Sequence, residues 1–298
     1  MSTRAKANLL LLSATAFWGA AGPIIKFTLG GIDPLPFLSY RLFLSGIVGL
    51  IILIVFRPKM PKNIKDYGFL VLYGLLSTTI SLGFLFSGLD RTTVLELGII
   101  GAVSPLIIVM GGGILLNEHV TKREKNGIFI AIFGILITIF SPILLGHDGF
   151  KFSGNILLLL FLLSDASGML LAKRMLKHKF SPLAITNFAF IVGALTFIPF
   201  AIATIGVDPL INAVATLPIK YHLGVWYMAL VSGTIAYFLF IRGTKSIEVG
   251  EAGLFAYLQP IFSVPLAVFW LGEAITFPFV VGGTITALGV YIAERKKG

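Results

Sequence analysis

A set of polar residues interrupts the long apolar runs of this sequence, and these residues could do chemistry there. The set comprises Trp18, Ser77, Thr79, Ser104, Asp165, Ser232, Thr234, Tyr257 and Gln259. In an apolar surrounding, a few such donors and acceptors can bind and orient a small polar solute. The hydroxyl groups can also bond to a neighbouring helix or back to their own helix. Both interpretations stay open for each hydroxyl.

Asp165 is the most informative member of this set, because it lies in the middle of the apolar run 153–173. If that run crosses a membrane, a carboxylate at its centre is costly unless it is protonated, paired or hydrated. We therefore expect Asp165 to bind either a substrate cation or a coupling proton. The alternative is a polar clamp to Ser167 or Trp18.

Four further charged residues are candidates for coupling or gating: Lys26, Arg41, Glu96 and Glu251. Glu96 ends a Thr-x-x-Glu pattern, and Glu251 falls in the first turn of an expected helix. For both acids we expect helix capping, with a gate or proton relay as the alternative. Lys26 and Arg41, with Asp33, can form an ion-pair gate, or each can extend its charge to the membrane interface.

Two prolines, Pro105 and Pro260, fall within apolar runs. Proline removes one backbone hydrogen bond from a helix and frees a carbonyl group, so a kink is expected at each position. The kink can act as a hinge, or it can be a static packing feature.

Several kinds of chemistry have no residues to support them. The chain has no cysteine, and its four histidines form no ligand set, so we expect no catalytic residue, metal or cofactor. The glycine patterns are Gly19-x-x-Gly22, Gly98-x-x-Gly101 and Gly111–Gly113. We interpret them as close helix packing rather than as phosphate loops.

The elements that must position these residues are membrane spans. The sequence of 298 residues is 57% hydrophobic and 12% charged, about half the charged share of a soluble protein. Hydropathy predicts ten spans at 7–29, 35–56, 67–87, 93–116, 126–142, 153–173, 182–205, 219–241, 249–271 and 277–293. The basic N-terminus imitates a signal peptide, but its apolar pattern continues to Leu29. We therefore predict an all-α polytopic membrane protein with an uncleaved first span.

The net charge of +10 has a topological meaning. Most of the 23 Lys and Arg residues fall in connections on the side of the N-terminus. Only Arg91, Lys151 and Lys220 fall in connections on the other side. By the positive-inside rule, both termini are expected in the cytoplasm, with the protein in the plasma membrane (the inner membrane of a Gram-negative cell). Nucleic acid is therefore not an expected partner.

An internal repeat organises the chain. Seven residues of the first half recur in the second at an offset of 155 residues, and they are Gly88, Glu96, Gly98, Pro105, Glu118, Gly127 and Gly134. A further match, at an offset of 148 residues, aligns Lys26 with Arg174 and Arg41 with Ala189. We predict halves at 1–146 and 147–298. With five spans in each half, the second is inverted relative to the first, a plan that recurs in secondary transporters with a midplane site.

The sequence resembles the drug/metabolite transporter superfamily, in particular its ten-helix EamA-type members. The resemblance covers nearly the whole chain, and its marks are Phe17-Trp18-Gly19, Tyr40-Arg41, Ser104-Pro105, Leu115-Leu116-Asn117-Glu118, Glu251-Ala252-Gly253-Leu254, Leu258-Gln259-Pro260 and Leu271-Gly272-Glu273. It implies a basket in which spans 1–4 and 6–9 surround a central cavity, with spans 5 and 10 peripheral. It also implies export or exchange of small metabolites, such as amino acids or drug-like solutes, by alternating access.

The alternative function is a sugar-phosphate or nucleotide-sugar exchanger of the same superfamily. That function requires cations within the membrane, and the sequence offers only Lys26 and Arg41. A lipid-modifying enzyme would need a clustered polar or metal site, and a receptor would need more extramembrane surface. The expected partners are a small-molecule substrate, the lipid bilayer and, as a candidate coupling ion, the proton. The protein is expected to be a monomer or a homodimer.

Overall fold

A computed structural model describes residues 3–61, 63–115, 121–144, 149–247, 252 and 254–294. These residues form helices and connections, and no strand occurs among them. The predicted all-α class is therefore confirmed. Glu118, Glu251 and Gly253 lie outside the described residues.

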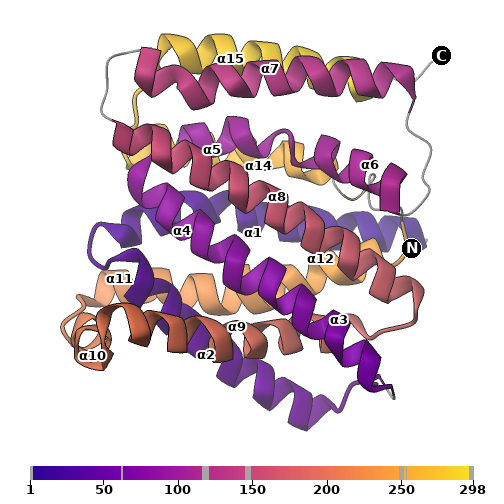
Figure 1. Ribbon diagram of the computed structural model, residues 1–298, viewed down its shortest axis with the longest axis vertical. Helices are drawn as coiled ribbons and strands as arrows, with labels where there is room; N and C mark the ends of the chain where they lie inside the picture. The colour runs from indigo at the N-terminus through magenta and orange to yellow at the C-terminus, as the bar shows by residue number, and fades with distance from the viewer. Residues whose placement is uncertain are drawn as a thin grey trace.

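The helices run in the chain order shown in Figure 1. Their bounds are α1 Thr3–Leu29, α2 Pro34–Phe56, α3 Ile64–Gly74, η1 Leu75–Ile80, α4 Ser81–Arg91, α5 Val94–Gly101, α6 Ser104–Leu115, α7 Lys122–Leu144, α8 Gly149–Lys177, α9 Pro182–Ile205, α10 Val207–Ala215, α11 Ile219–Trp226, η2 Tyr227–Ile235, α12 Ala236–Thr244, η3 Leu254–Leu258, α14 Gln259–Pro265, η4 Leu266–Trp270 and α15 Phe277–Glu294. Helix α1 begins, and helix α15 ends, at the same end of the bundle.

Most of these helices are long and apolar enough to cross a bilayer. The described residues contain eight such segments, and two shorter apolar helices follow at Phe255–Trp270 and Phe277–Ala293. Large apolar side chains face outward, including Phe133 at 57% exposed and Leu195 at 70%. A surface of this kind suits lipid rather than water. The short helix α10, which the sequence did not predict, lies in a connection.

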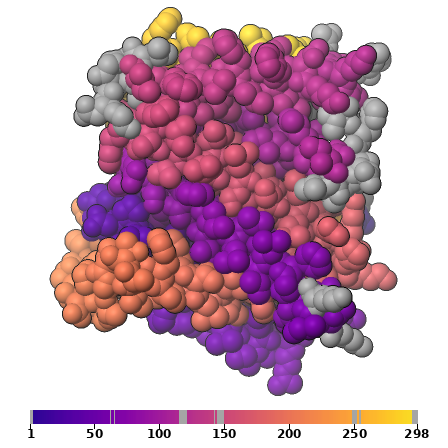
Figure 2. Space-filling view, viewed as in Figure 1, coloured from indigo at the N-terminus to yellow at the C-terminus, as the bar shows by residue number. Residues whose placement is uncertain are grey.

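Helices α7 and α15 form an antiparallel pair at one edge of the molecule (Figures 1 and 2). A Cβ atom on Gly134 would lie 2.5 Å from the Thr286 backbone nitrogen, and Gly127 is equally close to Gly289. Gly282 and Gly289 in turn meet α7. Because glycine has no side chain, the two backbones can approach this closely. The edge position agrees with the peripheral place that the resemblance implied for spans 5 and 10.

The remaining contacts repeat between the halves. Gly88 of α4 packs against Leu158 of α8, and Gly243 of α12 packs against Leu11 of α1. Since Gly88 and Gly243 are offset by 155 residues, Leu11 and Leu158 are equivalent at an offset of 147. The structure thus shifts the alignment of spans 1 and 6 by one residue from the predicted 148.

Two spans contain a wide, π-helical turn at equivalent positions. Segment η1 carries Ser77 and Thr79, and segment η2 carries Ser232 and Thr234. A π turn inserts a residue into the helical register and frees backbone groups to bond elsewhere. The Ser45 hydroxyl accordingly donates to the carbonyl oxygen of Ala229 in η2, at 3.1 Å.

The two prolines stand at the start of new helices rather than inside continuous ones. Helix α5 ends at Gly101, and Pro105 is the second residue of α6. Pro260 is likewise the second residue of α14, which follows the 3₁₀ segment η3. In place of the predicted kinks, the α-helix stops at Gly101 and resumes at Ser104, and the 3₁₀ segment η3 passes directly into α14. Proline favours the first turn of a helix because its missing N–H has no helical partner there.

Candidate functional site

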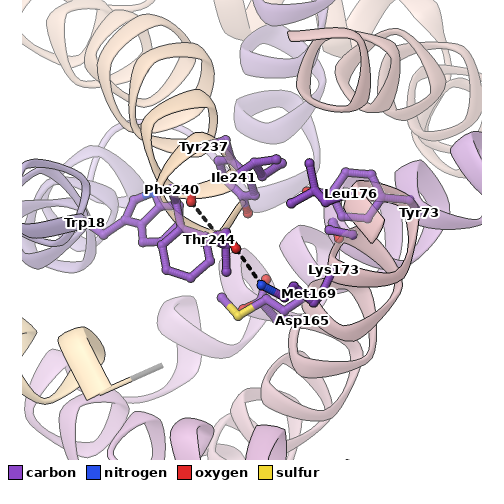
Figure 3. A pocket seen from close by; sticks show the side chains of 12 residues that line it. Trp18, Tyr73, Asp165, Met169, Lys173, Leu176, Tyr237, Phe240, Ile241 and Thr244 are labelled. Carbon is purple, nitrogen blue, oxygen red and sulfur yellow. Dashed lines mark hydrogen bonds between the residues drawn. The ribbon is translucent and has the colours of Figure 1, made fainter. Parts of the chain in front are cut away.

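Two cavities meet in the middle of the bundle. The larger has an empty volume of about 1030 Å³ and is bounded by α1, α2, α4, α5, α8, α12 and α14. The smaller, about 360 Å³, lies between α8, α12 and the α3–η1 segment (Figure 3). Trp18, Asp165, Met169 and Tyr237 line both cavities. These four side chains therefore form the boundary between the two chambers.

Asp165 places its carboxylate at that boundary. Tyr73 and Tyr237, which line the smaller cavity with it, interact electrostatically with this carboxylate. No hydrogen bond or ion pair joins the carboxylate to another residue that the structure describes. The clamp to Ser167 or Trp18, considered from the sequence, is not formed, because Ser167 donates to the Leu163 carbonyl at 2.8 Å. The carboxylate is thus available to a solute or a proton.

Trp18 is fixed in position by its neighbours. Its indole N–H donates to the Ser232 carbonyl at 3.0 Å. The rings of Tyr237 and Phe240 pack against it, with centroids 5.1 Å and 5.0 Å away. A rigid aromatic wall of this kind offers contact area at little cost in conformational entropy.

Arg41 lies inside the bundle and does not extend to an interface. Only 1% of its surface is exposed, and it lines the larger cavity. Its Nε atom donates to the Met228 carbonyl at 2.9 Å, and its guanidinium carbon lies 5.3 Å from the centre of the Phe86 ring. The cavity therefore holds one fixed cation.

Part of the cavity wall is made of glycine, which the sequence analysis missed. A Cβ atom added to Gly98 or Gly101 would meet nothing within 4 Å, and both residues line the larger cavity. The packing interpretation is right for Gly19, which meets Phe262, and for Gly22, which meets Leu97. It is wrong for Gly98 and Gly101, whose open space belongs to the cavity. Pro105 also leaves the Gly101 carbonyl without its helical donor.

The remaining predicted binding residues divide into two groups. Ser77 lines the smaller cavity, and Ser104, Ser232 and Gln259 line the larger one, as does the hinge candidate Pro260.

Thr79, Thr234 and Tyr257 line neither cavity. The Thr79 hydroxyl pairs with that of Thr196 at 2.7 Å, and the Thr234 hydroxyl donates to the Ala229 carbonyl at 3.2 Å. A regular helical register predicts Thr79 and Thr234 on the cavity face, but both residues lie in π turns, where that register does not hold.

Two charged side chains, Lys26 and Glu273, hold the connection between α4 and α5. Lys26 Nζ donates to the carbonyls of Leu89 and Asp90 at 2.7 Å and 3.3 Å, where α4 ends. Glu273 accepts from the backbone N–H groups of Val94 and Leu95 at 2.8 Å and 3.0 Å, where α5 begins. Burial raises the pKa of the Glu273 carboxyl, although these two donors act in the opposite direction. Lys26 thus binds helix ends rather than forming a gate with Asp33.

The capping box predicted for Glu96 is present. Thr93 accepts from the Glu96 backbone N–H at 3.1 Å, and Glu96 accepts from the Thr93 backbone N–H at 3.2 Å. The Glu96 carboxylate is therefore engaged at the N-terminus of α5.

Lys173 is the counterpart of Lys26 at the other end of the bundle. Its Nζ donates to the carbonyl of Thr244 at 2.7 Å (Figure 3) and also to that of Ile247. Leu89 and Thr244 are offset by 155 residues, so both lysines bind the end of an equivalent helix. The sequence alignment had paired Lys26 with Arg174 instead.

No group of three or more His, Asp or Glu side chains that could hold a metal ion occurs in the described part of the chain. The charged side chains that line the larger cavity are instead one guanidinium, of Arg41, and one carboxylate, of Asp165. A helical bundle with an apolar outer surface and a cavity of mixed polarity is typical of an integral membrane protein with a site for a small solute.

The chain belongs to the EamA-like transporter family, whose sequence model matches it twice, over residues 5–140 and 152–294. The resemblance to EamA-type transporters is therefore confirmed, and the protein is a membrane transporter.

Proteins similar to this chain are also named as transporters or efflux pumps. It is 28% identical over 298 residues to the uncharacterized transporter YyaM of Bacillus subtilis, covering 96% of this chain and 92% of the relative. It is 25% identical over 297 residues to a probable amino-acid metabolite efflux pump of Escherichia coli, covering 96% and 94%. A protein crystal structure aligns over 98% of both chains with a TM-score of 0.64 and 16% identity, which shows a shared fold.

Proposed function

We propose that the protein is a secondary transporter that exports or exchanges small metabolites, such as amino acids or drug-like solutes, across the plasma membrane by alternating access. The solute occupies the larger cavity, and Asp165 binds its cationic group or a coupling proton. The observation that carries this proposal is the unpartnered Asp165 carboxylate where the two cavities meet. A carboxylate in the membrane interior without a protein partner is a functional group by default.

The proposal also covers the organisation of the chain and its orientation in the membrane. Residues 1–146 and 147–298 form two inverted halves, and both termini face the cytoplasm. The repeated contacts of Gly88 with Leu158 and of Gly243 with Leu11 support the division. The clustering of basic residues on the side of the termini supports the orientation. The protein acts as a carrier and not as an enzyme.

The alternative, a sugar-phosphate or nucleotide-sugar exchanger, draws support from the buried Arg41 in the larger cavity. A phosphate group carries up to two negative charges and favours several cationic donors. Among the residues that line the larger cavity, Arg41 is the one with a basic side chain. The carboxylate of Asp165 in the same cavity also opposes a dianion. The metabolite transporter is therefore the better supported function.

Solute counterflow in proteoliposomes tests the proposal. Vesicles are preloaded with unlabelled amino acids, amines or sugar phosphates, and the entry of each labelled solute is followed. We expect one class to enter in exchange, and Asp165→Asn to slow that entry roughly a hundredfold or to remove its dependence on pH, because one buried charged contact is lost. Asp208→Asn is the control, since Asp208 is exposed in α10 outside both cavities. Unchanged rate and pH dependence in Asp165→Asn would remove Asp165 from the mechanism.

A further inference from the structure

Arg41 has binding capacity that the protein does not use. A guanidinium group carries five N–H donors and no acceptor. In Arg41 the Nε donor is taken by the Met228 carbonyl, and the Phe86 ring packs against the guanidinium. The buried Nη1 atom has no hydrogen-bond partner. A buried charge with an unused donor is costly unless another group completes its coordination.

The position of Arg41 indicates that a solute in the larger cavity can supply the missing hydrogen-bond acceptor. Its side chain lines the larger cavity, in which Asp165 is the carboxylate. Tyr237 lines the same cavity and interacts electrostatically with both Arg41 and Asp165. The cavity thus presents a cation and an anion, and no ion pair joins these two described residues. A solute that carries both charges can satisfy both residues at once.

We propose that Arg41 binds the carboxylate of a small zwitterionic solute whose ammonium group is held by Asp165. This assignment rests on the transport function proposed above and names the class of substrate. The guanidinium fork matches the two oxygens of a carboxylate. Gly98 and Gly101 leave open space in the same cavity, whose wall also includes the apolar side chains of Leu82 and Leu85, and an apolar side group of the solute fits there.

The repeat supports a single anion-binding position. The residue equivalent to Arg41 in the second half is Ala189, which lines neither cavity. A solute with one carboxylate needs one guanidinium, whereas a sugar phosphate would favour a second cation. The observations therefore favour a carboxylate as the anionic group.

The test compares acids with their amides in counterflow. The probe pairs are leucine with leucinamide and phenylalanine with phenylalaninamide, and O-phosphoethanolamine supplies an ammonium group with a phosphate. We expect the wild type to exchange each acid roughly tenfold or more faster than its amide, because the amide loses a charge-assisted hydrogen bond. In Arg41→Gln the acid-to-amide ratio should fall toward one, and in Arg41→Lys it should fall less. Arg91→Gln is the matched control, since Arg91 lines neither cavity.

Each outcome bears on a different claim. Equal exchange of acid and amide by the wild type, or an unchanged ratio in Arg41→Gln, overturns the role of Arg41 while transport itself stands. Faster exchange of O-phosphoethanolamine than of leucine overturns the carboxylate in favour of a phosphate. Absence of exchange of every probe by the wild type contradicts the proposed transport of such solutes, and the assignment with it. If Arg41→Gln does not fold, the wild-type ratio and Arg41→Lys decide the question.

Discussion

The two halves of the chain keep the same frame but differ in what they present to the cavity. Lys26 and Lys173 occupy equivalent positions, and each binds the carbonyls at the end of a helix. With the same offset of 147 residues, Trp18 is the equivalent of Asp165. Trp18 donates to the Ser232 carbonyl, whereas Asp165 has no hydrogen-bond partner among the described residues. Lysines that hold helix ends are thus repeated, whereas several residues that line the cavities, such as Trp18 and Asp165, are not.

This difference follows from the separate demands on the two sets. A repeated frame gives equivalent contacts at both ends of the bundle. A solute, in contrast, has no such symmetry, so its binding groups need not be repeated. Arg41 against Ala189, and Gly101 against Ala256, show the same contrast in the larger cavity.

The largest expected effect comes from breaking the frame where α7 meets α15. Gly134→Leu and Gly289→Leu each force a side chain against the backbone of the opposite helix. Such overpacking costs about 3 kcal/mol or more, because backbone atoms cannot move aside as a side chain can. We expect both variants to lose most of the monodisperse protein recovered in detergent, as measured by size-exclusion chromatography.

Gly68→Ala is the control for these two variants, since a Cβ atom there meets nothing within 4 Å. The equivalence of the halves predicts losses of similar size for Gly134→Leu and Gly289→Leu. Normal recovery of either variant would show that the helix pair is not a fixed part of the frame.

The next largest expected loss of stability comes from replacing the two lysines, which tests whether they are equivalent. Lys26→Met and Lys173→Met each remove a charged donor from helix-end carbonyls. Hydrogen bonds to charged groups contribute about 1.5–3 kcal/mol. We therefore expect both variants to lower the thermal midpoint in detergent by similar amounts. Lys151→Met, at an exposed position, should leave the midpoint unchanged. A loss confined to one lysine would mean that the two ends of the bundle are not equivalent.

Much of this frame could be predicted from the sequence. Apolar length and charge placement predict the helices, and the recurrence of Gly88, Pro105 and Gly127 predicts equivalent packing in both halves. These features follow from local composition and from spacing along the chain, which a single sequence displays. The pairing of Lys26 with Lys173 was missed because Lys173 lies nine residues before Pro182, where α9 begins, whereas Lys26 lies eight residues before Pro34, where α2 begins.

The cavity could be predicted only in part. Trp18, Asp165 and Gln259 lie where a regular register puts them, but Thr79 and Thr234 do not. A π turn changes the register by one residue, and nothing in the local sequence of η1 or η2 marks it. Packing glycines and cavity glycines also look alike in sequence, because only the neighbouring helix distinguishes them.

The smallest expected effect comes from a substitution that makes the two halves more alike at the cavity. Gly101→Ala gives the first half the residue that the second half has at Ala256, and the backbone of Gly101 does not have a positive φ angle. Alanine in place of a helical glycine should stabilise the protein by about 0.5–1 kcal/mol, while its methyl group enters the larger cavity. We expect slower counterflow of phenylalanine and unchanged counterflow of alanine. Gly68→Ala should stabilise the protein in the same way without changing either rate. Because the same substitution is made at both sites, equal slowing of both solutes in Gly101→Ala would mean that this wall does not select solutes by size.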